Sequence, residues 1–216
     1  MDIGVLTFVT LALLLLAVRA TVRAVRRRQW EGARGRNWWA ASLIALTLVA
    51  LWFEVGHDRR QLLATSAMSA LTDNPRAQAD CRRFSETFFS LGEHDGYVAR
   101  DTSDVAHYTN ESCKALASYA ASSKENPSLD QVAAVHLIAH ETMHVNGYWT
   151  ESEAECRAVQ LNSLVAEKLG ASEAQARALQ ARYFAEIYPN LMEEYVSGEC
   201  REGGALDIFP DRTEFP

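Results

Sequence analysis

Basic side chains are scarce over most of this chain. Residues 58–216 hold 14 basic and 25 acidic side chains, a net charge of −11, while the whole chain of 216 residues has a net charge of −7. A surface this acidic repels the phosphates of nucleic acids, which excludes nucleic acid as a partner. The sequence also lacks internal repeats and low-complexity segments, and its length allows one domain and a membrane anchor.

Cysteine is scarce too, and none of the four cysteines has the CxxC spacing of a zinc ribbon, which excludes a cysteine zinc site. All four follow residue 57: they are Cys81, Cys113, Cys156 and Cys200. An even number of cysteines in an oxidising compartment predicts two disulfides. We favour the pairs Cys81–Cys113 and Cys156–Cys200, because each would join neighbouring predicted helices.

Charge is absent from two apolar segments near the N-terminus, residues 3–18 and residues 38–53. Each segment needs only about one more helical turn to reach the roughly 20 residues that span a bilayer. The link between them, residues 19–37, contains seven arginines, and positive charge in a short loop marks the cytoplasmic side of a membrane. Residues 1–57 are therefore predicted to form a two-helix transmembrane hairpin with a cytoplasmic arginine-rich loop.

The position of the arginines also argues against a cleaved signal peptide. A signal peptide carries its positive charge before the apolar segment, whereas here the arginines follow residues 3–18. We therefore predict a multi-pass protein of the cell membrane, with the lipid bilayer as a partner. Both termini, and the whole domain of residues 58–216, would lie outside the cytoplasm.

Residues 58–216 predict a mainly helical α+β fold. Helices are expected from Pro75 to about Leu91, from Asn110 to Ala121, from Ser128 to Asn146, from Thr150 to about Leu169, and from Ser172 to near Pro189, with a short helix up to Ser197. Residues 97–109 are β-prone on both sides of a polar turn, so they predict a hairpin or a single edge strand. Gly147 suits the left-handed C-terminal cap of the third helix, and Thr150 with Glu153 matches a capping box for the fourth.

The segment HETMH, residues 140–144, places two histidines one helical turn apart. The imidazoles of His140 and His144 therefore share a helix face and can converge on one ion, for which zinc is well suited. Glu141 is displaced by about 100° around the helix axis, where its carboxylate can reach a water bound to the metal. We expect one zinc ion as cofactor and Glu141 as the catalytic base.

A third metal ligand must come from the glutamates that follow, Glu151, Glu153 and Glu155. Glu153 points about 200° away from both of the others, towards the capping position. The side chain of Glu151 tilts towards the start of its helix, whereas Glu155 lies level with the midpoint between the two histidines. Axial height therefore favours His140, His144 and Glu155 as the metal ligands.

HETMH resembles the motif of the HExxH zinc metallopeptidases. ESEAE, residues 151–155, resembles the ExxA[D/E] helix of the membrane gluzincins, and HETMHVNG is similar to the first half of the metzincin pattern. The metzincin third-ligand position is Thr150 here, and membrane gluzincins place many tens of residues between their two helices. The resemblance implies a zincin-like domain of the small, membrane-anchored type. It also implies Glu151 as the third ligand, with Glu155 as an acid that orients a histidine, so the choice between the two glutamates stays open.

Several other side chains are candidates for supporting roles. His136 lies one turn before His140 and could line the cleft, while His107 and Tyr108 lie on the predicted strand, where an extended substrate could pair. Tyr108 or Tyr148 could stabilise an oxyanion. Asp207 in the C-terminal tail could contact the site.

Together these patterns predict a membrane-anchored zinc-dependent peptidase. It would hydrolyse a peptide or protein substrate through a metal-activated water. The alternative is a zinc-binding structural or interaction protein with little or no catalytic activity, which would not need Glu141.

Overall fold

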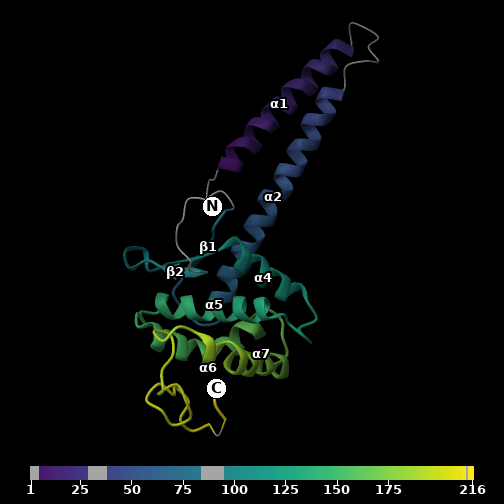
Figure 1. Ribbon diagram of the computed structural model, residues 1–216. Coiled ribbons are helices and arrows are strands. Elements are labelled where there is room, and N and C mark those ends of the chain that lie inside the picture. The colour runs from purple at the N-terminus through teal and green to yellow at the C-terminus, as the bar shows by residue number, and fades with distance from the viewer. Residues whose placement is uncertain (1–4, 29–37, 84–94, 213) are drawn as a thin grey trace. The chain divides into compact units, whose positions relative to one another are not determined.

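The computed structural model divides into two compact units, Met1–Arg59 and Arg60–Pro216 (Figure 1). It describes residues 5–28, 38–83, 95–212 and 214–216. The boundary expected from the sequence, after residue 57, lies two residues before the observed one.

The first unit contains helix α1 (Val5–Arg28) and the part of helix α2 (Trp38–Met68) that precedes residue 60. The Thr7 hydroxyl at the start of α1 lies 3.4 Å from Oε1 of Glu54 on α2, so the two helices run antiparallel. Small side chains are among those that this unit buries: Thr10, Ala17, Thr47 and Ala50. Large apolar side chains such as Leu15, Leu48 and Trp52 are exposed instead.

Of the helices in the described ranges, one is long and apolar enough to cross a membrane, over Ala41–Met68. No second helix in the described ranges meets the same test. A two-helix transmembrane hairpin is therefore not supported. Most of the predicted cytoplasmic loop, residues 29–37, lies outside the described residues.

The second unit contains a three-stranded sheet of β1 (Gln78–Cys81), β2 (Gly96–Val98) and β3 (Val105–Tyr108) in the order β1-β3-β2. Strand β2 pairs antiparallel with β3, so of the two predicted alternatives the hairpin is the one that forms, and a short helix η1 (Arg100–Thr102) lies in its turn. Strand β1 pairs parallel with β3, with Cys81 opposite Tyr108.

The predicted helix from Pro75 to Leu91 is wrong where the structure describes it. Residues 78–81 form a strand because their burial alternates, with Ala79 and Cys81 facing the core, and because the Gln78 amide donates to the Asp104 carbonyl. This tertiary pairing overrides the local helix-start signal at Asn74-Pro75. Residues 84–91 of that prediction lie outside the described part of the chain.

Four helices follow the sheet: α4 (Asn110–Ala121), α5 (Leu129–Val145), α6 (Glu151–Lys168) and α7 (Glu173–Glu186), with a short helix η2 (Tyr188–Asn190) after them. Their bounds match the predicted ones within a few residues. Figure 1 shows α5 in the middle of the unit, and it contacts α4, α6, α7 and the strands β2 and β3. The predicted short helix up to Ser197 is not formed, since turns follow η2.

Local capping explains where most of these helices begin and end. Ser128 forms a capping box with Gln131 at the start of α5, and Gly147 takes the predicted left-handed conformation after it, with φ of 93°. Thr109, rather than Asn110, caps α4 through its side chain. The predicted capping box of Thr150 is absent, because Thr150 makes no side-chain cap bond and the Glu153 carboxylate pairs with Arg157 instead.

Two disulfides join Cys81 to Cys113 and Cys156 to Cys200, which confirms the two predicted bridges and the favoured pairing. The first connects β1 to α4, and the second connects α6 to the segment that follows η2. The bridges close loops with sequence separations of 32 and 44. Each loop of this length removes unfolded-state entropy worth about 4 kcal/mol.

Candidate metal centre

Helices α5 and α6 lie antiparallel and present two facing rows of side chains. His136, His140 and His144 follow one another at intervals of one turn on α5, and Glu151 and Glu155 do so on α6. The rows interdigitate: Glu151 contacts His140 and His144, while Glu155 contacts His136 and His140. His140 is therefore shared between two groups of possible metal ligands.

The first group, His140, His144 and Glu151, has the dimensions of a zinc site. The two Nε2 atoms lie 3.1 Å apart, and Oε2 of Glu151 lies 3.2 Å from that of His140 and 3.3 Å from that of His144. Zinc–ligand bonds of 2.0–2.1 Å in a tetrahedron imply ligand atoms about 3.3–3.4 Å apart. One ion can therefore contact all three atoms with very small shifts.

Both histidines are held with Nε2 towards that point. Nδ1 of His144 lies 2.7 Å from the carbonyl oxygen of Tyr148, and Nδ1 of His140 lies 2.8 Å from Oε2 of Glu155. When each Nδ1–H donates to its oxygen, Nε2 keeps the lone pair that binds a metal.

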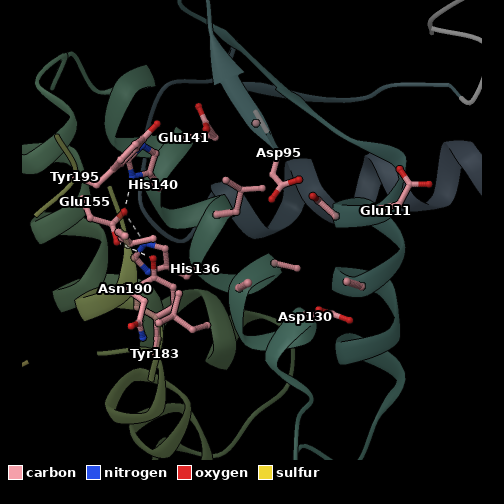
Figure 2. Close-up of a pocket in the computed structure, with 18 of the residues that line it drawn as sticks. Asp95, Glu111, Asp130, His136, His140, Glu141, Glu155, Tyr183, Asn190 and Tyr195 are labelled. Atoms are coloured by element: carbon pink, nitrogen blue, oxygen red, sulfur yellow. Dashed lines mark hydrogen bonds and ion pairs between the residues drawn. The ribbon is translucent and has the colours of Figure 1, made fainter. Parts of the chain in front are cut away.

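Glu155 does not join His144, so the predicted set of His140, His144 and Glu155 is not brought together. Its carboxylate is buried on the other side of the His140 ring, where it accepts hydrogen bonds from His136, His140 and Tyr183 at 2.9, 2.8 and 2.7 Å (Figure 2). The expectation from axial height fails because α6 places Glu151, not Glu155, level with the gap between His140 and His144. The arrangement agrees with the one that the resemblance implied.

The second group, His136, His140 and Glu155, is a buried hydrogen-bond network. Asn162 Nδ2 donates to Nδ1 of His136 at 3.1 Å, which leaves Nε2–H of His136 to donate to Glu155. Burial lowers the pKa of His136, and the opposing effect of Glu155 does not restore it, so this imidazole stays neutral. The His136 ring also stacks on Tyr183, with centroids 3.5 Å apart. His136 thus holds the Glu155 carboxylate in place, and that carboxylate in turn fixes the orientation of the His140 ring.

The electrostatics of the first group favour a positive charge between its ligands. Burial lowers the pKa of His140, but hydrogen bonds to Glu151 and Glu155 outweigh this effect and raise the pKa to about 10. Hydrogen bonds to His140 and His144 lower the pKa of Glu151 to about 2, although burial opposes them. A proton therefore lies between these groups in the metal-free protein, and a metal cation can take its place.

Glu141, the predicted base, is buried against strand β2. A Cβ atom on Gly96 would lie 2.8 Å from Oε1 of Glu141, so only glycine leaves room for this carboxylate in its present position. Two cavities meet here, one of about 570 Å³ and one of about 250 Å³. Both are lined by Gly96, His140, Glu141 and Tyr195.

The two cavities differ in their remaining linings. The smaller contains the metal ligands His144 and Glu151, and Trp149, whose ring stacks on His144 with centroids 5.9 Å apart. The larger contains the carboxylates of Asp95, Glu111 and Asp130, and its lining within the described chain includes neither lysine nor arginine. Figure 2 shows His140, Glu141 and Tyr195 on one side of the residues that line the larger cavity, and these three acids on the other.

His136 lines the larger cavity, as predicted, whereas the remaining candidates from the sequence lie outside both cavities. Tyr108 is buried in the core, and the Tyr148 ring packs on Arg157 at 3.9 Å, so neither lines the space where an oxyanion would form. His107 pairs with Asp80 at 2.8 Å on the sheet. Asp207 accepts hydrogen bonds from backbone amides of its own loop.

Sequence reasoning missed Gly96 and Tyr195. Each lies more than forty residues from HETMH along the chain, and no local pattern marks either.

Comparison with known proteins finds no matching family, no similar curated protein and no matching solved structure. The likeness to the zincins therefore rests on residues 140–155 and on the geometry described above.

Proposed function

We propose that this chain is a membrane-anchored zinc peptidase. The observation that carries the proposal is the triangle of His140 Nε2, His144 Nε2 and Glu151 Oε2, with sides of 3.1 to 3.3 Å, beside the buried carboxylate of Glu141. Three protein ligands leave a fourth tetrahedral position for water, which is typical of catalytic rather than structural zinc.

The residues around the triangle have separate tasks. A bound zinc ion would lower the pKa of its water and polarise the scissile carbonyl. Glu141 takes a proton from the attacking water and returns it to the nitrogen of the leaving amine. Glu155, held by His136 and Tyr183, keeps the His140 ring oriented for the metal.

The substrate would be an extended peptide. Within the described chain, β2 pairs only with β3, and Gly96, Tyr97 and Val98 of β2 line the smaller cavity. A peptide added along this edge would pass Glu141, with residues on the two sides of the scissile bond entering different cavities. The acids of the larger cavity favour neutral or basic side chains over acidic ones.

We further propose that residues 1–59 anchor the chain in a membrane and that the metal centre lies outside the cytoplasm. The exposed apolar side chains of residues 1–59 suit a lipid environment better than water. The arginine-rich link suits the cytoplasmic face, and the two disulfides suit an oxidising compartment for the metal centre. The peptidase would then act at the outer face of the membrane.

The alternative is a zinc-binding structural or interaction protein. It shares the triangle but has no use for a buried carboxylate beside it, so Glu141 separates the two proposals. Glu141→Gln keeps the size of the side chain and removes the base.

The test compares Glu141→Gln with the wild type, using the full chain in detergent, metal analysis and a broad library of quenched peptides. Glu153→Gln is the matched control, because Glu153 pairs with Arg157 on the same helix hairpin but lines neither cavity. We expect one zinc per chain in all three proteins and loss of hydrolysis in Glu141→Gln alone. A zinc-loaded wild type that cleaves nothing would favour the alternative, and a wild type that binds no zinc at neutral pH would exclude both.

A further inference from the structure

Helix α1 has two opposite faces that differ in chemistry. Thr10 and Ala17 are buried and lie on one face. Arg19, Arg23 and Arg26 lie about 180–240° around the helix axis from Ala17, so they share the other face. All three arginine side chains are exposed. We call these three residues the arginine face of α1.

The arginine face lies at the level where the apolar part of α2 begins. Helices α1 and α2 lie side by side, and the contact between Thr7 and Glu54 fixes their antiparallel register (Figure 1). Arg23 and Trp38 lie at equal distances along their helices from that contact, so they are about level with each other. Trp38 is 80% exposed, and tryptophan is enriched at the membrane–water interface. The part of α2 that is long enough to cross a membrane starts just after it, at Ala41.

Neighbouring carboxylates do not neutralise the arginine face. Helix α1 contains no acidic residue over Val5–Arg28, and α2 contains none before Glu54. Glu54 lies at the far end of the helix pair, next to Thr7. Within residues 5–28 and 38–53 there is therefore no carboxylate to balance the three guanidinium groups.

Apolar side chains lie directly beside the arginine face. Val18, Val22 and Val25 are exposed and lie about 100° from the arginines around the helix axis. A helix segment with an apolar face next to a basic face suits the boundary between acyl chains and headgroups. The valines can contact acyl chains while the guanidinium groups extend towards the phosphates.

We propose that the arginine face of α1 binds the headgroups of anionic phospholipids. A guanidinium group can donate two parallel hydrogen bonds to one phosphate, which suits it for this ligand. The cytoplasmic leaflet, where the arginine-rich link is proposed to lie, is the leaflet with a negative surface potential. The inference rests on the proposed membrane anchor and is independent of peptidase activity. It gives the chain a preference for one class of lipid.

The test measures the affinity of the full chain, in a nonionic detergent, for two lipids with a fluorescent label on the acyl chain. The lipids are phosphatidylglycerol and phosphatidylcholine, and energy transfer from the tryptophans of the chain reports binding. We expect phosphatidylglycerol to bind about five-fold more tightly for each arginine that it engages, since one arginine at an anionic surface contributes about 1 kcal/mol. The preference should disappear in about 1 M salt, where charges are screened beyond about 3 Å.

Two triple variants show whether the arginine face carries the preference. The first replaces Arg19, Arg23 and Arg26 by glutamine and should bind the two lipids about equally. The matched control makes the same charge change at three exposed arginines of the second unit, Arg76, Arg177 and Arg212, and should keep the wild-type preference. If the first variant does not fold, Arg19→Gln, Arg23→Gln and Arg26→Gln made singly should each lower the preference in part.

Three results would overturn the proposal. They are a wild type that binds both lipids equally, glutamine variants of the arginine face that keep the preference, and a control variant that loses it, since the last would show an effect of overall charge. Failure of the membrane anchor is a separate result. The wild type would then leave vesicles of either lipid in an alkaline wash, whatever its affinities in detergent.

Discussion

Replacing Glu151 and Glu155 in turn by glutamine tests the metal centre directly. Glu151 offers one oxygen to the space between the histidines, and its side chain is 38% exposed. Glu151→Gln therefore removes a ligand and its charge but little packing. We expect zinc affinity to fall more than about 100-fold, beyond the range for residues that only orient a ligand. The metal-free protein should lose less stability than in Glu155→Gln, because the ion pairs of Glu151 with His140 and His144 are partly exposed and therefore screened by solvent.

Glu155→Gln should produce the opposite order of effects. The Glu155 carboxylate accepts three hydrogen bonds, from His136, His140 and Tyr183, whereas an amide has only one accepting oxygen and must turn its NH₂ group towards at least one donor. At least one charged hydrogen bond is lost, which costs about 1.5–3 kcal/mol of stability in the metal-free protein. Zinc affinity should fall only about 10- to 100-fold, equivalent to about 1.4–2.7 kcal/mol.

The assays are competitive zinc titration with a fluorescent chelator and thermal unfolding of the metal-free chain. Glu153→Gln, which carries the same charge change on α6 without facing the site, should leave zinc affinity unchanged. We expect the two assays to rank the variants in opposite order. Glu151→Gln should bind zinc more weakly, and Glu155→Gln should be the less stable protein. If Glu155→Gln binds zinc more weakly than Glu151→Gln, the assignment of Glu151 as ligand is refuted.

Three further predictions concern the base, the disulfides and the membrane. Gly96→Ala should displace the Glu141 carboxylate, since the new Cβ would lie 2.8 Å from Oε1. We expect kcat to fall on the order of 100-fold with zinc content unchanged. An unaltered kcat would show that this contact does not position the base. The unreduced protein should show no alkylatable thiol after unfolding, and two free thiols would contradict the pairing. Loss of either bridge should lower the free energy of unfolding by about 4 kcal/mol, as measured by chemical denaturation. A reporter fused after Pro216 should score as extracytoplasmic and one inserted near Gly32 as cytoplasmic, and the reverse result would overturn the orientation of the anchor.

The parts of the fold that were predictable depend on local chemistry. Ser128 and Ser172 begin α5 and α7 through capping boxes, and Gly147 and Gly170 follow α5 and α6 with positive φ, so these signals lie within a few residues of the boundaries they mark. Strand β1 was missed because its pairing with β3 and its bridge to Cys113 are distant along the chain. A local helix signal cannot compete with such contacts.

Local sequence likewise predicts some parts of the candidate site and not others. The one-turn spacing of His140 and His144 on a helix predicts that their imidazoles converge on one point. In the structure their Nε2 atoms lie 3.1 Å apart. The choice between Glu151 and Glu155 depends on the offset between α5 and α6, which residue spacing does not contain. Tyr195 reaches the site only because a disulfide and the η2 turn hold its segment there.

The ligand triangle also has a consequence for the order of folding. His140, His144 and Glu151 are separated along the chain only by the last residues of α5 and the short link before α6. Closing so short a loop has a small entropic cost, whereas the parallel pairing of β1 with β3 joins segments much further apart. The α5–α6 hairpin can therefore form its ion-binding point before the sheet exists, and zinc that meets the unfolded chain would nucleate this hairpin. We expect refolding of the disulfide-bonded chain to be faster with zinc than with a chelator, and equal rates would show that the triangle forms only at the end.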